Sequence, residues 1–594
     1  MTEKQMRSET EEADRAWIVE YGLEAPQEKR DSAWLKPRHL YLISLGGCIG
    51  TAYLVGSGRT LARGCPAMTL SAFVIICSVV WVFSTLLLEI AAYIPLHGAA
   101  PDFYSTAFLS KSFGFALGWN YWYAYAILVP FEITTATLII QYWDPPVNVA
   151  IFITILMVII VGLNYLPVAS SGEAEFAFSS LKLSLLLGLI ILSIVLASGG
   201  GPSGDRVGFR YWHDPGPANT WIIEGNAGLF VSFLGTLVSV ILPLSFAVEM
   251  VATTGGETRS PRKTIPVAAK AFVVRLVVFY VLPILAVTLT CPSNAKELTS
   301  RGARARASPF VVGIKHAGIK VLDHIVNAVI LCSAWSAGNI YTYLASRSIY
   351  SLAVAGNAPQ IFAKTNRWGV PYFAVTSCAV IALLAYLSVS SGAGVVFNWF
   401  VNMINMAAYF SWILCSLSYL RFRKALEFQG IDHKTLPYVS ICGKPGAWLC
   451  IVFFTIVGLL NGFYTFFPSQ WNVSDFMTAY VGTLLFVVLY IGHRFTVGRK
   501  EPWFIPVDEI DLTGAKTEEE IKAHRRRKME ARRQPLRIIR SIQILSQLRS
   551  GRAGLGKIEQ FWCDPENYFF FFVSMSTRAF LAAFRTARQP LYVM

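Results

Sequence analysis

Two carboxylates lie inside long apolar stretches of this sequence. Glu132 stands in the middle of the apolar run 115–142, and Glu249 stands toward the end of the run 227–252. A charged side chain in the hydrocarbon core of a membrane costs about 2.5–3.5 kcal/mol, so it needs a partner, a cavity or a proton. Both residues are candidates for proton coupling. The alternatives are a polar link to a neighbouring helix for Glu132 and a helix-end carboxylate at the cytoplasmic interface for Glu249.

Glycines cluster in a third candidate segment, residues 46–58, which reads GGCIGTAYLVGSG. Each glycine weakens a helix by about 1 kcal/mol relative to alanine. One interpretation is close packing of helices through small residues. The other is a broken helix whose free N–H groups bind a substrate carboxylate. The glycines alone do not separate the two.

A fourth segment, residues 333–341, contains Asn339 among small residues and is followed by Arg347. The small residues favour tight packing between helices. Arg347 is interpreted as a helix-end residue that extends its guanidinium toward the membrane surface, rather than as a ligand.

The elements that must position these residues are membrane-spanning helices. The chain has 594 residues, of which 54% are hydrophobic and only 15% charged, whereas ordinary soluble domains are about 25% charged. A membrane core needs about 20 apolar residues per helix, and in lipid the backbone must satisfy its own hydrogen bonds. Twelve runs meet this need: 40–62, 68–93, 115–142, 147–166, 176–197, 227–252, 270–291, 321–350, 374–391, 396–420, 446–468 and 474–494.

These runs divide the chain into an N-terminal tail, 1–37, a transmembrane domain, 38–495, and a basic C-terminal tail, 496–594. An even number of helices places both termini on one side, and Lys and Arg mark the cytoplasmic face. Most basic loop residues fall on the side of the termini, so we expect both tails to be cytoplasmic. The loop 292–320 is also basic and argues the other way.

The net charge of +15 is explained by cytoplasmic loops and the basic tail rather than by nucleic-acid binding. The ten cysteines form no CxxC pair and are interpreted as small core residues, so we predict no metal site and no cofactor. The sequence contains no P-loop, HExxH, dinucleotide or GxSxG motif. We therefore predict a transporter driven by a gradient, and not an enzyme.

Several motifs resemble the fungal amino-acid permeases, a branch of the amino acid–polyamine–organocation superfamily, and they occur in the order of that family from about residue 34 to 500. They are LKPRHL at 35–40 with GGCIGT at 46–51, GWNYW at 118–122, GETRSPRKTIP at 256–266, ASR at 345–347, GNAP at 356–359, GVPY at 369–372, VFNW at 396–399, RFR at 421–423 and NGF at 461–463.

The resemblance implies an all-α membrane fold of two inverted five-helix repeats plus two extra helices, with helices one and six broken at mid-membrane. It places the substrate between the two breaks, with its carboxylate at backbone N–H groups of helix one. The positions that match the substrate site are Ile49, Gly50, Thr51 and Ala52 on helix one and Ser245, Phe246, Ala247 and Val248 on helix six. Glu132 and Glu249 match acidic positions of helices three and six.

Two alanines depart from the family pattern. The family has glycine where Ala52 and Ala247 stand, and glycine allows closer approach and a wider range of φ values. We expect the two methyl groups to narrow the pocket and reduce unwinding. The consequence would be a small or altered substrate, or weakened transport.

The C-terminal tail is a further departure. Between residues 522 and 552 basic residues dominate, and 536–542 could lie on anionic lipid as an amphipathic helix. Residues 553–594 match nothing in the family, and we interpret them as a gene-model artefact such as an altered reading frame or a retained intron.

The predicted function is secondary active transport of L-amino acids across the plasma membrane by alternating access, with protons as coupling ion and membrane lipid as surroundings. Sodium coupling stays open. The alternative is an amino-acid sensor that keeps the permease fold but does not transport. A channel is disfavoured because no pore-lining rings of charge are evident.

Overall fold

The computed structural model describes residues 50–512 apart from 96–100, 167, 203, 257–260, 300–307, 367 and 511. The predictions for Ile49, for the N-terminal tail and for residues 553–594 lie outside these residues. The chain divides into two compact units, 1–514 and 515–594, and everything described here belongs to the first.

The described residues form helices and no strand, which confirms the all-α prediction. Within the described residues, nine helices are long and apolar enough to cross a membrane, and Val149–Leu163 (α8) and Gly443–Leu459 (α21) are shorter apolar helices. The first of the nine contains two helices that meet at Cys65, so each of the twelve predicted runs corresponds to helix in the part of the chain that is described.

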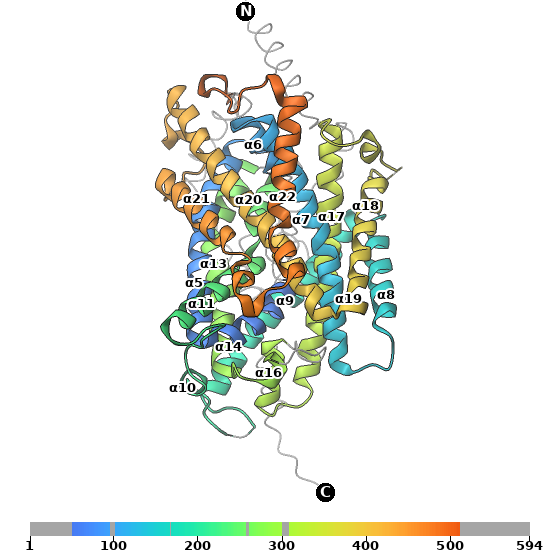
Figure 1. Ribbon diagram of the computed structural model, residues 1–594, viewed down its shortest axis with the longest axis vertical. Helices are drawn as coiled ribbons and strands as arrows, with labels where there is room; N and C mark the ends of the chain where they lie inside the picture. The colour runs from blue at the N-terminus through green and yellow to red at the C-terminus, as the bar shows by residue number, and fades with distance from the viewer. Residues whose placement is uncertain are drawn as a thin grey trace, which may run out of the picture. The chain divides into compact units, whose positions relative to one another are not determined.

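The other principal helices have these bounds: α7 Lys111–Ile140, α9 Val168–Ala197, α11 Gly225–Ser239, α13 Pro261–Leu276, α14 Leu282–Thr290, α17 Leu322–Val354, α18 Tyr372–Ala382, α19 Leu387–Ser391, α20 Ala393–Phe428 and α22 Val473–Phe495. Short helices cover the two ends of this bundle, with α6 (Asp102–Phe108) at one end and α10 (Arg210–His213) and α16 (Pro309–His316) at the other (Figure 1).

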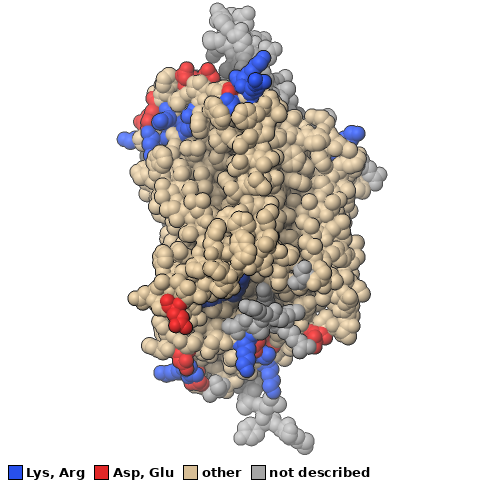
Figure 2. Space-filling view, in the orientation of Figure 1, with Lys and Arg blue, Asp and Glu red and all other residues tan. Residues whose placement is uncertain are grey.

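Charged side chains gather at these two ends, and a broad band between them carries almost none on the face that Figure 2 shows. This distribution fits a protein whose middle section lies in lipid, because charge is costly there. We call the two ends the α6 end, which the loop charges predict to be cytoplasmic, and the α10 end, which they predict to be outside. The eight described cysteines are free thiols, and six of them are buried.

Helix one is broken, as predicted. Gly50 has an extended backbone, a short helix α4 spans Thr51–Leu54, and Val55 separates it from α5 (Gly56–Tyr93). A second interruption inside α5 falls at Cys65, where φ is 56°, directly before Pro66. Proline cannot continue the hydrogen bonds of a helix, so it ends helix one and begins helix two.

Helix six is also broken. The helix α11 ends at Ser239, a 3₁₀ turn covers Leu242–Leu244, and α12 begins at Ala247 and runs to Gly256. Phe246 lies between the turn and α12 with a φ of 61°, a left-handed conformation that costs a non-glycine residue about 1–2 kcal/mol. Ala247 is itself helical, and the strained residue of this break is Phe246.

The two breaks occur in the first helix of each five-helix set. Helices α7 and α17 pack against each other and carry the polar residues that face the breaks. Beyond the last span, residues 496–512 fold back onto the α6 end, where Ile505 N–H donates to the Leu109 carbonyl at 2.8 Å and Ile510 is buried.

Candidate functional site

A small cavity lies where the breaks of helices one and six face each other. It is lined by Gly50, Ala52, Leu128, Glu132, Leu242, Pro243, Ser245, Phe246 and Tyr341. Five of these are residues that the sequence analysis singled out. The open space measures about 10 Å³, which is about what one water molecule requires. The cavity must therefore widen before it admits an amino acid.

Glu132 forms one wall of the cavity and is 1% exposed. Its Oε2 accepts a hydrogen bond of 2.6 Å from the Thr51 hydroxyl. A Cβ built on Gly50 would lie 2.9 Å from Glu132 Oε1, so the absence of a side chain at residue 50 lets the carboxyl group rest against the backbone of helix one. The hydrogen bond from Thr51 is a polar link between neighbouring helices, as the alternative interpretation of Glu132 expected. The same carboxyl group also faces the cavity.

A buried lysine that the sequence analysis did not single out lies behind this carboxyl group. Lys182 on α9 is 1% exposed, and its Nζ donates to Ser336 Oγ on α17 at 2.9 Å. It is close enough to Glu132 to interact with it electrostatically. The signal in the sequence was a charged residue inside the predicted span 176–197, the same signal that identified Glu132.

Phe246 closes the helix-six side of the cavity and is 1% exposed. Its ring packs edge-on against Tyr121 at 5.9 Å and lies 5.3 Å from the ring of Tyr125. Ser245 Oγ donates to the Ile241 carbonyl at 3.0 Å. Ala247 and Val248 are buried in α12 and do not line the cavity.

Glu249 lies one turn into α12 and is fully buried. Its Oε1 accepts a hydrogen bond of 2.8 Å from Ser411 Oγ, and Ser411 also bonds the Tyr121 hydroxyl. Its Oε2 is buried and makes no hydrogen bond of good geometry, and the Trp412 indole, whose Nε1 is likewise unbonded, is the neutral donor next to the Glu249 carboxyl group. The alternative of a solvated helix-end carboxylate is therefore wrong, because the side chain points into the bundle.

Asn339 and Arg347 stand apart from the cavity. Asn339 Oδ1 accepts from Asn164 Nδ2 at 2.8 Å, which ties α17 to α8. The Arg347 guanidinium lies over the ring of Tyr343, 5.3 Å from its centroid. Among the residues that the structure describes, no group of three His, Cys, Asp or Glu is placed to hold a metal ion.

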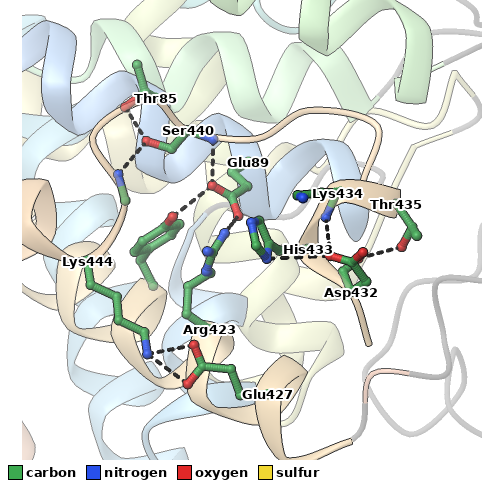
Figure 3. A network of polar contacts seen from close by, with 12 residues as sticks. Thr85, Glu89, Arg423, Glu427, Asp432, His433, Lys434, Thr435, Ser440 and Lys444 are labelled. Atoms are coloured by element: carbon green, nitrogen blue, oxygen red, sulfur yellow. Dashed lines mark hydrogen bonds and ion pairs between the residues drawn. The ribbon is translucent and has the colours of Figure 1, made fainter. Parts of the chain in front are cut away.

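A third buried carboxylate, also not singled out from the sequence, lies at the α6 end (Figure 3). Glu89 is fully buried, and its Oε1 pairs with Arg423 Nη1 at 2.8 Å. Its Oε2 accepts from the Tyr419 hydroxyl and from the Ser440 N–H, both at 2.8 Å. Thr85 Oγ1 completes the cluster at 2.7 Å from Ser440 Oγ. We call these five residues the Glu89 cluster.

Comparison with known proteins identifies the family of this chain. The family model "Amino acid permease" matches residues 39–506. A proline-specific permease of Emericella nidulans is 42% identical over 488 residues, which cover 82% of this chain and 88% of that permease. This chain belongs to the fungal amino acid permease family. This chain is also 39% identical to a proline-specific permease of Saccharomyces cerevisiae over 510 residues, which cover 84% of this chain and 80% of that permease.

A dicarboxylic amino acid permease of Saccharomyces cerevisiae is 39% identical over 485 residues, covering 80% of this chain and 79% of that permease. Among solved structures, a manganese transporter of Eremococcus coleocola superposes with a TM-score of 0.50 at 11% identity, covering 80% of this chain and 97% of that one. This second likeness concerns the fold alone. Membership of the family makes the permease an integral membrane transporter of amino acids and not an enzyme.

Proposed function

We propose that this permease is a proton symporter of the plasma membrane that carries a small neutral L-amino acid by alternating access, with proline the first candidate. The observation that carries the proposal is the position of Glu132, a buried carboxyl group on the wall of the cavity between the two helix breaks. Helix breaks of this kind bind substrate in transporters built from inverted repeats.

The contacts of Glu132 suggest how a proton and a substrate are coupled. Its carboxyl group rests against Gly50 and the Thr51 hydroxyl, where the family resemblance places the substrate carboxylate. Two carboxylates at one place repel each other, and one of them then binds a proton more readily. Proton uptake by Glu132 would remove this repulsion, so substrate and proton would bind together.

Glu249 is the second coupling candidate. A buried, ionised carboxylate with an unpaired oxygen is very unfavourable, so a neutral acid suits the surroundings of Oε2. Through Ser411 and Tyr121 the group is linked to the ring of Phe246. A change in its protonation would therefore reach the residue that closes the cavity.

Three features support a neutral substrate and a proton. The side chains that line the cavity beside Glu132 and Ser245 are apolar or aromatic, apart from the Tyr341 hydroxyl, and several relatives are named proline-specific permeases. Lys182 contributes a fixed cation next to Glu132, which disfavours a sodium ion at the same place. The sensor alternative gains nothing from relatives that bear permease names.

Uptake of labelled amino acids in cells that lack their own permeases tests this proposal. Saturable proline uptake that rises at acidic pH and collapses with an uncoupler is expected. Uptake that depends on sodium and ignores pH would contradict proton coupling. No uptake of any amino acid, with the protein present at the cell surface, would favour the sensor or a permease disabled by Ala52 and Ala247.

A further inference from the structure

Two arginines project from the outer half of helix one, between the cavity and the α10 end. Arg59 and Arg63 are four residues apart in α5, so they lie on the same face of the helix. Arg59 follows Ala52 by seven positions, which is about 10 Å at about 1.5 Å per residue. Arg59 is exposed although it lies in an apolar span.

Neighbouring elements hold both guanidinium groups in place. Arg63 Nη1 donates to the Gly235 carbonyl at 2.8 Å and to Ser239 Oγ at 3.1 Å, and the group stacks on Trp221 at 4.1 Å. Arg59 Nη1 bonds the amide oxygen of Asn398 at the start of α20. Each guanidinium has five N–H donors, and the bonds named above involve only the Nη1 group of each arginine.

The charges around Arg59 and Arg63 do not balance. Arg59 and Arg63 are close enough to repel each other, and Asp475 is the carboxylate that acts on Arg59. Asp475 Oδ1 is itself held by Trp399 Nε1 at 3.2 Å. Among the described residues neither arginine makes an ion pair within 4 Å. Two fixed cations opposite one carboxylate favour the approach of an anion.

Two aromatic rings adjoin both the cavity and the arginines, because Phe397 directly precedes Asn398, the partner of Arg59. The rings of Phe397 and Phe131 are 4.9 Å apart, and Phe131 directly precedes Glu132. A Cβ built on Gly56 would lie 3.9 Å from the Phe397 ring, so this ring also packs against helix one.

We propose that Arg59 and Arg63 form an outer binding site for the carboxylate of an arriving amino acid. The site favours neutral and acidic amino acids over lysine and arginine, whose extra cation is repelled. Guanidinium groups suit this task because their planar donor fork matches the two oxygens of a carboxylate. The inference rests on the proposed function, because it describes how that function selects its substrates.

Kinetics of three variants test the site. Arg59→Gln and Arg63→Gln should each raise the KM for L-proline uptake by about tenfold while the maximal rate stays unchanged, and should raise by more the concentration of L-glutamate that half-inhibits this uptake. Asp475→Asn removes the negative charge and should shift the half-inhibiting concentration of glutamate in the opposite direction. Arg59→Lys keeps the charge and should retain much of the affinity. Added salt should reduce the wild-type preference, because the Debye length is about 8 Å at physiological ionic strength.

Arg210→Gln is the matched control, since Arg210 is an exposed arginine at the same end that pairs with Asp205 at 2.7 Å. An equal effect of the control, or unchanged KM values in both arginine variants, would overturn the proposal. If an arginine variant does not reach the surface, the opposite shift in Asp475→Asn decides.

A binding measurement separates failure of this site from failure of transport itself. If the wild type takes up no amino acid, L-glutamate and L-lysine are titrated onto the purified protein and followed by tryptophan fluorescence, with Trp221→Phe as the reference. Stronger quenching by glutamate that is lost in Arg63→Gln supports the site even then. Equal responses to both amino acids would reject it.

Discussion

The buried carboxylates at the α6 end and at the middle of the bundle differ in how completely they are bonded. Glu89 has a cation on one oxygen and two neutral donors on the other. Glu249 has one neutral donor and leaves Oε2 unpaired, and Glu132 has the Thr51 hydroxyl and otherwise faces the cavity. Both kinds of site are nearly inaccessible to solvent.

This difference in bonding separates a carboxylate that is held in place from two carboxyl groups whose protonation can change. An ion pair with further hydrogen bonds holds the Glu89 carboxylate in place, and it joins α5 to the end of α20 and to the following loop. The central carboxyl groups lack such a partner within bonding distance in the described residues, so their protonation can follow the substrate. Burial alone therefore does not distinguish the three carboxylates, and their bonding is the reason why Glu132 and Glu249, and not Glu89, are proposed for coupling.

The largest effect is expected from breaking the Glu89 cluster. Glu89→Gln leaves the partly buried Arg423 and the fully buried donors around residue 89 without the carboxylate and should lower the free energy of unfolding by about 3–5 kcal/mol. Thermal unfolding of the purified protein in detergent measures this. The control is Glu427→Gln, which removes an exposed pair with Lys444 at 2.7 Å and should cost less than about 1 kcal/mol. Equal stability of the two variants would mean that the cluster is not structural.

Glu249→Gln should affect transport strongly and stability little, the opposite of what is expected for Glu89→Gln. An amide has the shape of a neutral acid, so the free energy of unfolding should change by less than about 1.5 kcal/mol, while uptake falls at least about tenfold. Surface level and initial uptake rate are measured in the same cells. A variant that unfolds like Glu89→Gln, or that transports normally, would place Glu249 with the fixed carboxylates.

Thr51 tests the same comparison, because its hydroxyl is the donor that bonds Glu132. Thr51→Val removes the hydroxyl that bonds Glu132 and should weaken substrate uptake by about 1 kcal/mol, which is about fivefold in the ratio of maximal rate to KM. Thr51→Ser keeps the hydroxyl and serves as the control. Identical kinetics in the two variants would show that the bond to Glu132 is not used in transport.

The smallest effect concerns the two alanines that depart from the family pattern. Ala52 lines the cavity, whereas Ala247 lies in the first turn of α12 and does not. Ala52→Gly should therefore admit larger amino acids, and Ala247→Gly should leave the substrate range as it is. Competition of unlabelled amino acids against labelled proline measures the range. A wider range in Ala247→Gly alone would contradict this assignment.

The helices were predictable because long apolar runs mark them. The breaks in helices one and six were expected from the family resemblance, since the glycines at 46–58 alone left close helix packing open. The position of the backbone strain in helix six was not predictable. The family pattern has glycine at the position of Ala247, but the residue in the left-handed conformation is Phe246.

The bonding of the carboxylates was not predictable either. Ser411 is 162 positions from Glu249, and Ser440 is 351 positions from Glu89. Such partners are set by the packing of helices, which one sequence does not specify. The charge of Glu89 and Lys182 inside apolar runs was a visible signal that the sequence analysis passed over.

Proton-driven accumulation by Glu132→Gln tests the central claim most directly. The variant and the wild type are reconstituted into liposomes, and proline uptake is measured with an imposed pH gradient and, separately, as exchange against internal proline. The account predicts that the variant retains exchange and loses accumulation driven by the gradient. Accumulation equal to that of the wild type would contradict the assignment of Glu132 as the coupling residue.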